Sequence, residues 1–132
     1  MKIHGLNEAA KNIHALAVSK GWWEEDRTLP EILMLCVSEL SEALEEYRDG
    51  RPTLYCKRKA TDNEKHLTFD PANCEPQGEK GEKPYGIAVE FADCIIRILD
   101  YCGRTGIDIE EALALKHEYN KSRPHRHGGK KC

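Results

Sequence analysis

The stretch Glu90-Phe91-Ala92-Asp93 lies inside a long apolar run, Gly86–Cys102. At about 100° per residue, apolar side chains cover most of a helix over this run, and the acidic side chains fall in the remaining sector. A helix that is apolar around most of its circumference is normally buried. Two carboxylates three positions apart on one face would therefore repel each other beside a core, and a bound cation would compensate their charge.

A solvent-facing ion pair is the alternative explanation of these acids. Arg97 falls in the same polar sector, where it would pair with Glu90 or Asp93 and leave the face solvated, as charged helix faces usually are. This one helix does not decide between a cation and an ion pair. A second helix with the same acidic spacing favours the cation.

That second helix is predicted from Thr28-Leu29-Pro30-Glu31, a capping-box pattern with proline in the first turn, to about Arg48. Glu39 and Glu42 fall at the border of its apolar stripe. If the two helices face each other, their acids surround one point, and such oxygen ligands suit Mg²⁺ or Mn²⁺. A ferritin-type di-iron site is excluded because the chain has no Glu-x-x-His motif.

Two further helices complete the predicted fold. One covers Asn7–Lys20, and the other begins after the cap Asp108 and ends near Ser122. The length of 132 residues fits one domain, 1–132. We therefore expect an all-α fold built from four helices.

An irregular insertion, residues 51–85, separates the second predicted helix from the third. It holds four of the six prolines and shows little periodicity. Thr53–Cys56 and His66–Phe69 are predicted as two short strands of a hairpin, and 77–84 as a mobile loop. Disorder, an oligomer contact and a lid all remain open as its role.

Composition restricts the class of protein. The net charge of −3 does not favour a general nucleic-acid binder, and no stretch approaches the ~20 apolar residues of a membrane span. The first residues, Met1–Gly5, show no signal-peptide core. None of the six cysteines forms a C-x-x-C pair, which predicts a reducing cytoplasm and no disulfide framework. A zinc site using Cys56 and Cys74 is possible, without support from the spacing.

The C-terminal segment and the two tryptophans have competing interpretations. Residues 116–132 hold six Lys or Arg and a single Glu, as in a solvated tail or a phosphate-binding segment. Trp22 and Trp23 pack at a helix corner, or form an aromatic wall for a ligand ring.

Carboxylates, a metal and basic groups together indicate phosphate-ester or anhydride chemistry. The absence of G-x-x-x-x-G-K-[ST] excludes a P-loop.

Three motifs together resemble the MazG-like all-α nucleoside triphosphate pyrophosphohydrolases, a superfamily that includes dimeric dUTPases and dCTPases. They are Ser-Glu-Leu-Ser-Glu-Ala at 38–43, Glu-Phe-Ala-Asp at 90–93, and Lys-x-x-x-Asn-Lys-x-Arg-Pro-x-x-His-Gly-Gly-Lys at 116–130. The resemblance covers nearly the whole chain apart from 51–85. It implies a helical bundle completed by dimerisation, often as a dimer of dimers. It also implies Mg²⁺-dependent cleavage of nucleoside triphosphates to the monophosphate and pyrophosphate.

The resemblance also implies roles by position. The catalytic, metal-binding carboxylates would be Glu39, Glu42, Glu90 and Asp93. Substrate would be bound by Asn120 at the nucleotide, by Trp22 or Trp23 at the base or sugar, and by phosphate-binding Lys116, Lys121, Arg123 and Lys130. Two departures exist: Ser38 replaces the first acid of the family's E-E-x-x-E motif, which weakens a second metal site, and the insertion lengthens the spacing between the acidic pairs.

We therefore expect a cytoplasmic, Mg²⁺-dependent nucleoside triphosphate pyrophosphohydrolase, for house-cleaning or nucleotide-pool control. It would act as a homodimer or homotetramer, without a membrane or a nucleic-acid polymer as partner. Two alternatives use the same scaffold: a helical interaction module without turnover, and a binding module that takes a phosphorylated ligand on the basic segment. The sequence does not identify the preferred base.

Overall fold

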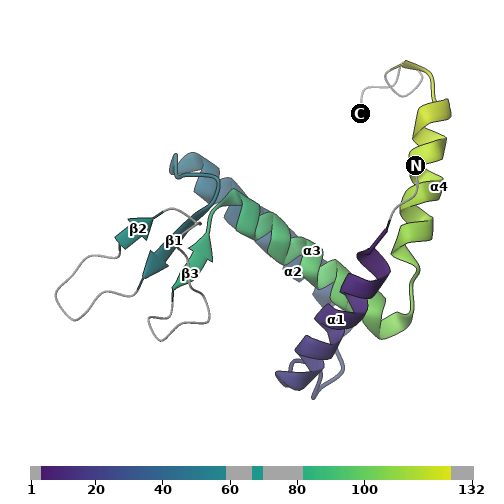
Figure 1. Ribbon diagram of the computed structural model, residues 1–132, viewed down its shortest axis with the longest axis horizontal. Coiled ribbons are helices and arrows are strands. Elements are labelled where there is room, and N and C mark those ends of the chain that lie inside the picture. The colour runs from purple at the N-terminus through teal and green to yellow at the C-terminus, as the bar shows by residue number, and fades with distance from the viewer. Residues whose placement is uncertain (1–3, 59–66, 70–81, 126–132) are drawn as a thin grey trace. The chain divides into compact units, whose positions relative to one another are not determined.

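The computed structural model describes residues 4–58, 67–69 and 82–125, and these form four helices and three short strands (Figure 1). In chain order the elements are α1 (Leu6–Ser19), α2 (Leu29–Arg48), β1 (Tyr55–Arg58), β2 (Leu67–Phe69), β3 (Lys83–Tyr85), α3 (Ile87–Thr105) and α4 (Ile109–Ser122). The four predicted helices are confirmed. The third extends two residues past Gly103, where the sequence predicted its end. The chain forms two compact units, Arg27–Ile98 and the combination of Met1–Asp26 with Leu99–Cys132.

Two predicted capping residues begin their helices. The Thr28 side chain accepts a hydrogen bond from the backbone N–H of Glu31, and Asp108 accepts one from that of Glu111 at 3.0 Å. Each bond satisfies a backbone donor that the first turn of a helix leaves without an intrahelical partner. Local sequence therefore decides where α2 and α4 begin.

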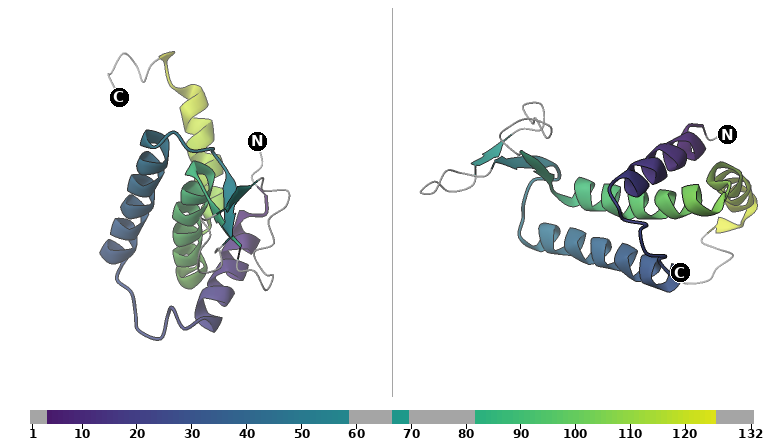
Figure 2. Two further views of the ribbon diagram at one scale, coloured as in Figure 1. Left: turned by 90° about the vertical axis from the view of Figure 1, so that its left-hand side faces the viewer. Right: turned by 90° about the horizontal axis from the view of Figure 1, so that it is seen from below.

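In the unit Arg27–Ile98, α2 and the first part of α3 run side by side in opposite directions (Figure 2). The buried side chains of α2 are Ile32, Cys36, Glu39, Ala43 and Glu46. Cys36 and Cys94 are both buried, and the Cys36 thiol lies 4.0 Å from the carbonyl oxygen of Cys94. Small side chains at this contact allow the two helices to approach closely, and two acidic residues share the buried face with them.

The insertion contains a three-stranded antiparallel sheet in the order β2-β1-β3. The predicted hairpin corresponds to β1 and β2, although β1 begins two residues later than expected, at Tyr55. The loop prediction for 77–84 was wrong at its end, where Lys83 and Pro84 belong to β3, and 77–81 lie outside the described residues. Because β3 is an edge strand, it tolerates a proline that has no N–H to donate.

Backbone and side-chain contacts fasten the sheet to both helices. Gly86 joins β3 to α3 at φ 115°, and a Cβ atom there would lie 2.2 Å from the carbonyl oxygen of Thr53. The same oxygen accepts a hydrogen bond from the N–H of Ala88 at 3.0 Å. On the other side, the Tyr55 hydroxyl donates to the Glu46 carboxylate of α2, 2.9 Å from its nearer oxygen. The sheet therefore has a fixed place at one end of the α2–α3 pair.

The second unit has its own small core. Ala10 on α1 is buried with Leu99 and Cys102 of α3, and Leu6, Ala9, Ile13 and Ile109 pack around them. Gly103 allows this approach, since a Cβ atom there would lie 2.5 Å from the carbonyl oxygen of Ala10. The Asn7 side chain then links α1 to the start of α4 through Asp108, at 2.8 Å.

Cysteine chemistry differs in part from the expectation. Cys36, Cys94 and Cys102 are free and buried, as their apolar helix faces predict. Cys56 is disulfide-bonded, and its partner lies outside the described residues. The expectation of no disulfide was therefore wrong at this position, because residue spacing does not show which cysteines a sheet brings together. A disulfide sulfur is no thiolate, so Cys56 is not available for the zinc site considered above.

Membrane insertion receives no support from the helices. Within the three described ranges, none of them combines the length and the apolar character needed to cross a bilayer.

Candidate metal centre

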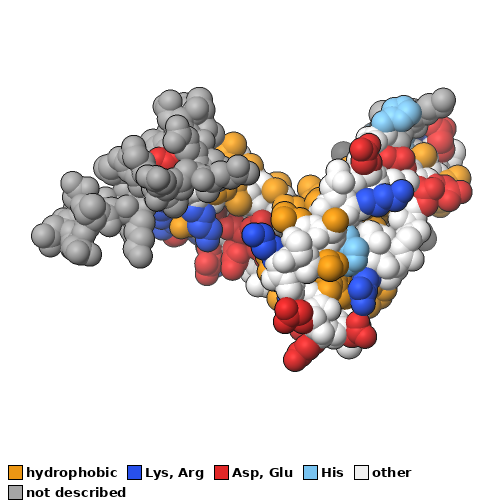
Figure 3. Space-filling model, turned by 60° about the horizontal axis from the view of Figure 1, so that its bottom comes forward, with side chains coloured by type: hydrophobic (Ala, Val, Ile, Leu, Met, Phe, Trp, Pro, Cys, Tyr) orange, Lys and Arg blue, Asp and Glu red, His pale blue; other side chains and the backbone are white. Residues whose placement is uncertain are grey.

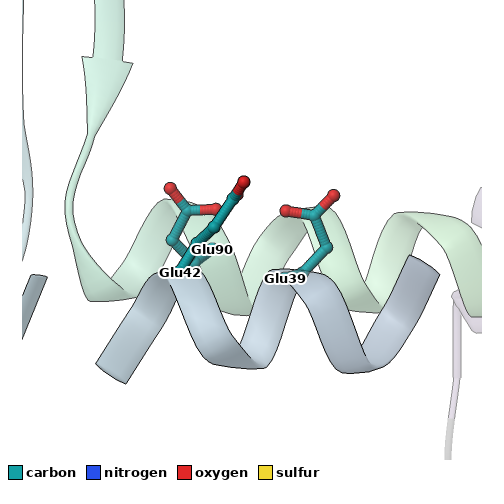
Figure 4. Close-up of side chains that lie close together, drawn as sticks. All are labelled: Glu39, Glu42 and Glu90. Atoms are coloured by element: carbon teal, nitrogen blue, oxygen red, sulfur yellow. The ribbon is translucent and has the colours of Figure 1, made fainter. Parts of the chain in front are cut away.

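Three of the four predicted acidic residues meet between α2 and α3. Glu39 and Glu42 come from successive turns of α2, and Glu90 comes from the first turn of α3 (Figure 4). One carboxylate oxygen from each residue lies within 4.8 Å of the others. The structure thus brings together side chains that are separated by the whole insertion in sequence. We call Glu39, Glu42 and Glu90 the carboxylate cluster.

Asp93 lies beside the carboxylate cluster and is not part of it. Burial raises the pKa of Asp93, and the neighbouring charge of Glu39 raises it further. Arg97 and Lys83 oppose this shift through their positive charges. Asp93 is therefore a half-buried carboxyl group in the electrostatic field of Glu39, Arg97 and Lys83.

Arg97 pairs with an acid across the two helices. Its Nε donates to Oε1 of Glu39 at 2.8 Å, and its Nη2 lies 2.8 Å from the same oxygen. This differs from the ion pair with Glu90 or Asp93 that the sequence left open. The reason is the register of the antiparallel helices, which places Arg97 opposite Glu39. Arg97 therefore compensates one charge of the cluster and holds that carboxylate in one orientation.

Glu90 carries the most poorly satisfied oxygen of the carboxylate cluster. Its Oε2 is buried and has no hydrogen-bond partner among the residues that the structure describes. Burial raises the pKa of Glu90 to about 7, and contacts with Glu42, Glu39 and Asp93 contribute to the increase. Burial also opposes ionisation of Glu39, yet the hydrogen bond from Arg97 outweighs it together with contacts to Glu42 and Glu90, so that the pKa of Glu39 is lowered. The pKa values of these neighbouring carboxyl groups therefore shift in opposite directions, because Arg97 stabilises the charge of Glu39 whereas burial and neighbouring acids disfavour that of Glu90.

The carboxylate cluster fits a hard divalent cation. Mg²⁺ binds oxygen ligands at about 2.1 Å, which puts ligand oxygens roughly 3–4 Å apart around the ion. Small rotations of the glutamate side chains therefore bring oxygens that now lie within 4.8 Å onto one ion. In this arrangement Oε2 of Glu90 becomes a ligand of the ion. It thereby gains the polar contact that it lacks among the described residues. No di-iron or zinc chemistry is suggested, since the donors are carboxylates alone.

The predicted substrate-binding residues that the structure describes lie in the other unit, Met1–Asp26 with Leu99–Cys132. Trp23 has a packing role there: its indole Nε1 donates to both oxygens of Asp100 at 3.0 Å, and the His14 ring meets it edge-on. Trp22 remains 51% exposed. The two tryptophans therefore differ in exposure and in bonding, and Trp22 is the one whose ring is open to a ligand.

The basic residues of the C-terminal segment lie along and just after α4. Lys116 and Arg123 are positioned over the Tyr119 ring, 4.7 and 5.7 Å from its centroid, and Lys121 pairs with Glu118. Asn120 is exposed on the same helix, and Lys130 lies outside the described residues. The structure thus groups the described members of this set on one helix end.

Sequence reasoning missed the contact that attaches the sheet to α2 and the two lysines that the strands place opposite each other. The Glu46–Tyr55 hydrogen bond and the positions of Lys57 and Lys83 depend on strand register inside an insertion that has no periodic pattern. No local signal in the sequence marks them. Comparison of the chain with protein-family models, with curated proteins and with solved structures found no match.

The raised pKa of Glu90 predicts that the metal-free protein loses stability as the pH rises from about 5 to about 8. An unfolded glutamate has a pKa of about 4.3, whereas Glu90 has one of about 7 in the fold. Between these values the folded state binds more protons, so the free energy of unfolding falls with rising pH, by up to roughly 4 kcal/mol at 1.36 kcal/mol per pKa unit. Urea unfolding in EDTA across this range measures the effect.

Two variants make this measurement specific. Glu90→Gln cannot ionise, so its stability should be nearly flat where the wild-type stability falls. Glu45→Gln alters an exposed glutamate of the same helix pair and should keep the wild-type slope. A flat wild-type profile, or a Glu90→Gln profile with the full slope, would contradict the assigned environment of Glu90.

Proposed function

We propose that the chain is an Mg²⁺-dependent nucleoside triphosphate pyrophosphohydrolase, which converts a (d)NTP and water to a (d)NMP and pyrophosphate. One observation carries the proposal: carboxylates from two helices converge, and a buried oxygen of Glu90 has no partner among the described residues. Such a site takes a hard cation, and Mg²⁺ in proteins usually shares its coordination with substrate phosphates. The motifs at 38–43, 90–93 and 116–130 support the same reaction through the family resemblance.

In the proposed mechanism, Glu39, Glu42 and Glu90 would hold Mg²⁺, which would supply charge neutralisation and Lewis-acid polarisation of the phosphate oxygens. Arg97 keeps Oε1 of Glu39 fixed, which leaves Oε2 of Glu39 available beside Glu42 and Glu90. Asp93 accepts the proton of the attacking water, because it lies next to the cluster and burial raises its pKa towards the working range of a general base. The water oxygen forms a new bond to phosphorus, and the phosphoric anhydride bond breaks with pyrophosphate as the leaving group.

Substrate recognition in this proposal uses the residues that the resemblance assigns. The exposed ring of Trp22 would stack on a base, and Asn120 would contact the nucleotide. Lys116, Lys121, Arg123 and Lys130 would bind phosphates. Trp23 is better assigned to packing, since its N–H is committed to Asp100.

Removal of a carboxylate from the cluster, or of the neighbouring Asp93 carboxylate, is expected to abolish most turnover without unfolding the protein. Glu42→Gln and Asp93→Asn should each lower kcat by about 10²-fold or more, the size of effect seen when one preorganised electrostatic group is removed. Pyrophosphate release from a panel of nucleoside triphosphates, with and without Mg²⁺, measures this and identifies the preferred base. Circular dichroism melting checks that each variant folds.

Glu45→Gln serves as the matched control, because Glu45 is exposed on α2 and lies outside the cluster. It should keep wild-type turnover. If neither the wild type nor the control releases pyrophosphate, the result favours a binding module without turnover. Unchanged release by both Glu42→Gln and Asp93→Asn would refute the assigned roles.

Self-association belongs to the same proposal, because α2 exposes a regular apolar stripe. Its members, each 49% exposed or more, are Leu33, Val37, Leu40, Leu44 and Tyr47. Their alternating spacing of four and three residues is the heptad pattern by which helices pack on helices. On α3, Phe91, Ile95 and Ile98 follow the same spacing and are 41–52% exposed. Because monomers rarely expose so large an apolar surface, we propose that a second copy covers it in a homodimer or homotetramer.

A charge in the α2 stripe is therefore expected to separate the subunits. Leu40→Lys puts an ammonium group at the middle of the proposed interface, where it would be desolvated without a partner. Light scattering coupled to size exclusion should give two or four times 15.0 kDa for the wild type and a smaller assembly for the variant.

Leu115→Lys is the control for this experiment, since Leu115 is 66% exposed on α4, outside the stripe. It should keep the wild-type mass. A monomeric wild type, or a Leu40→Lys variant with the wild-type mass, would count against the interface.

A further inference from the structure

One face of the sheet carries two lysines and two tyrosines in register. Strands β1 and β3 pair Tyr55 with Tyr85 and Lys57 with Lys83. Because alternate side chains of a strand point to the same face, all four lie on one side of the sheet. The tyrosine rings stack with their centroids 5.7 Å apart. The pairing therefore places two ammonium groups side by side next to an aromatic surface.

The two lysine side chains converge on one ring. Nζ of Lys57 lies 4.8 Å from the centroid of the Tyr85 ring, and Nζ of Lys83 lies 5.1 Å from the same centroid. Like charges directly opposite each other on antiparallel strands repel. Among the residues that the structure describes, neither ammonium group forms an ion pair with a carboxylate. An anion bound by both would replace this repulsion with attraction.

The lysine pair has a fixed place near the carboxylate cluster. Strand β3 continues through Gly86 into α3, whose first turn carries Glu90. The Tyr55 hydroxyl is bonded to Glu46, which lies one helical turn beyond Glu42 on α2. The charge of Lys83 opposes the increase in the pKa of Asp93, so the two groups are close enough to interact. In Figure 3, Lys and Arg side chains adjoin a group of Asp and Glu side chains on one face of the molecule.

We propose that Lys57 and Lys83 form a polyphosphate-binding pair, which takes the phosphate chain of a ligand whose metal ion is held by the carboxylate cluster. Two ammonium groups on neighbouring strands match the oxygens of successive phosphates, and Lys binds such oxygens as a point charge. Strands β1 and β3 are thereby part of the proposed substrate site, in addition to the basic C-terminal segment. The inference rests on the proposed function for its ligand, a nucleoside triphosphate.

Tripolyphosphate is the probe that separates this inference from the proposed reaction, because it carries a phosphate chain without a base or a sugar and its binding is measured without nucleotide turnover. Its binding to the full chain is measured by isothermal titration calorimetry in the presence of Mg²⁺. Lys57→Gln and Lys83→Gln should each weaken binding about tenfold, which corresponds to roughly 1.4 kcal/mol. The double variant should lose more than either, and Lys57→Arg with Lys83→Arg should retain binding because both charges remain. Lys11→Gln, an exposed lysine on α1, should bind like the wild type.

The outcomes distinguish the two proposals. A wild type without affinity for tripolyphosphate, or a double Gln variant that binds as tightly as the wild type, overturns the lysine pair. Nucleotide turnover by the double Gln variant with an unchanged KM also overturns it and leaves the pyrophosphohydrolase standing. Binding of tripolyphosphate that depends on both lysines, in a protein that hydrolyses no nucleotide, supports the pair and contradicts the reaction. Retained melting temperatures establish that any loss is not unfolding.

Discussion

Repulsion among the carboxylates of Glu39, Glu42 and Glu90, which converge from two antiparallel helices, is the constraint on which the rest of the structure depends. Glu39 is buried, Glu90 is half-buried and Glu42 is exposed. Small side chains at the contact, among them Cys36 and Cys94, let α2 and α3 approach, and the same contact brings Glu39, Glu42 and Glu90 together. Arg97 compensates Glu39 alone. The remaining negative charge is maintained at a cost in stability, since a fold under no functional demand would gain by replacing these acids with apolar groups. A cation that satisfies them gives that cost a physical explanation.

The insertion takes its importance from how it is attached to this helix pair. The Glu46–Tyr55 bond holds β1 against α2, and Gly86 joins β3 directly to the turn that carries Glu90. A short sheet with these attachments presents its lysines at a defined place instead of on a loose loop. Negative carboxylates and positive ammonium groups then lie in one unit, Arg27–Ile98, which is the combination that a metal–polyphosphate ligand needs.

Local patterns in the sequence predicted the parts of this arrangement that local physics controls. Thr28 and Asp108 mark helix starts because a cap needs only residues within one turn. Acids three positions apart share a helix face, so the sequence predicts that Glu39 and Glu42 lie together. The sequence did not predict which acid pairs with Arg97, because that pairing depends on the register between helices that are distant in sequence. Strand β3 was missed because three residues that include Pro84 carry no strand pattern, and the pairing of Lys57 with Lys83 follows from that strand.

Anomalous diffraction from crystals grown with Mn²⁺ is the sharpest test of whether the carboxylate cluster binds a divalent cation, because it locates the ion without reference to any activity. We expect a strong anomalous peak between α2 and α3, within bonding distance of a carboxylate oxygen from each of Glu39, Glu42 and Glu90. Crystals in which these side chains point to separate surfaces, with Mn²⁺ bound elsewhere or nowhere, would contradict it.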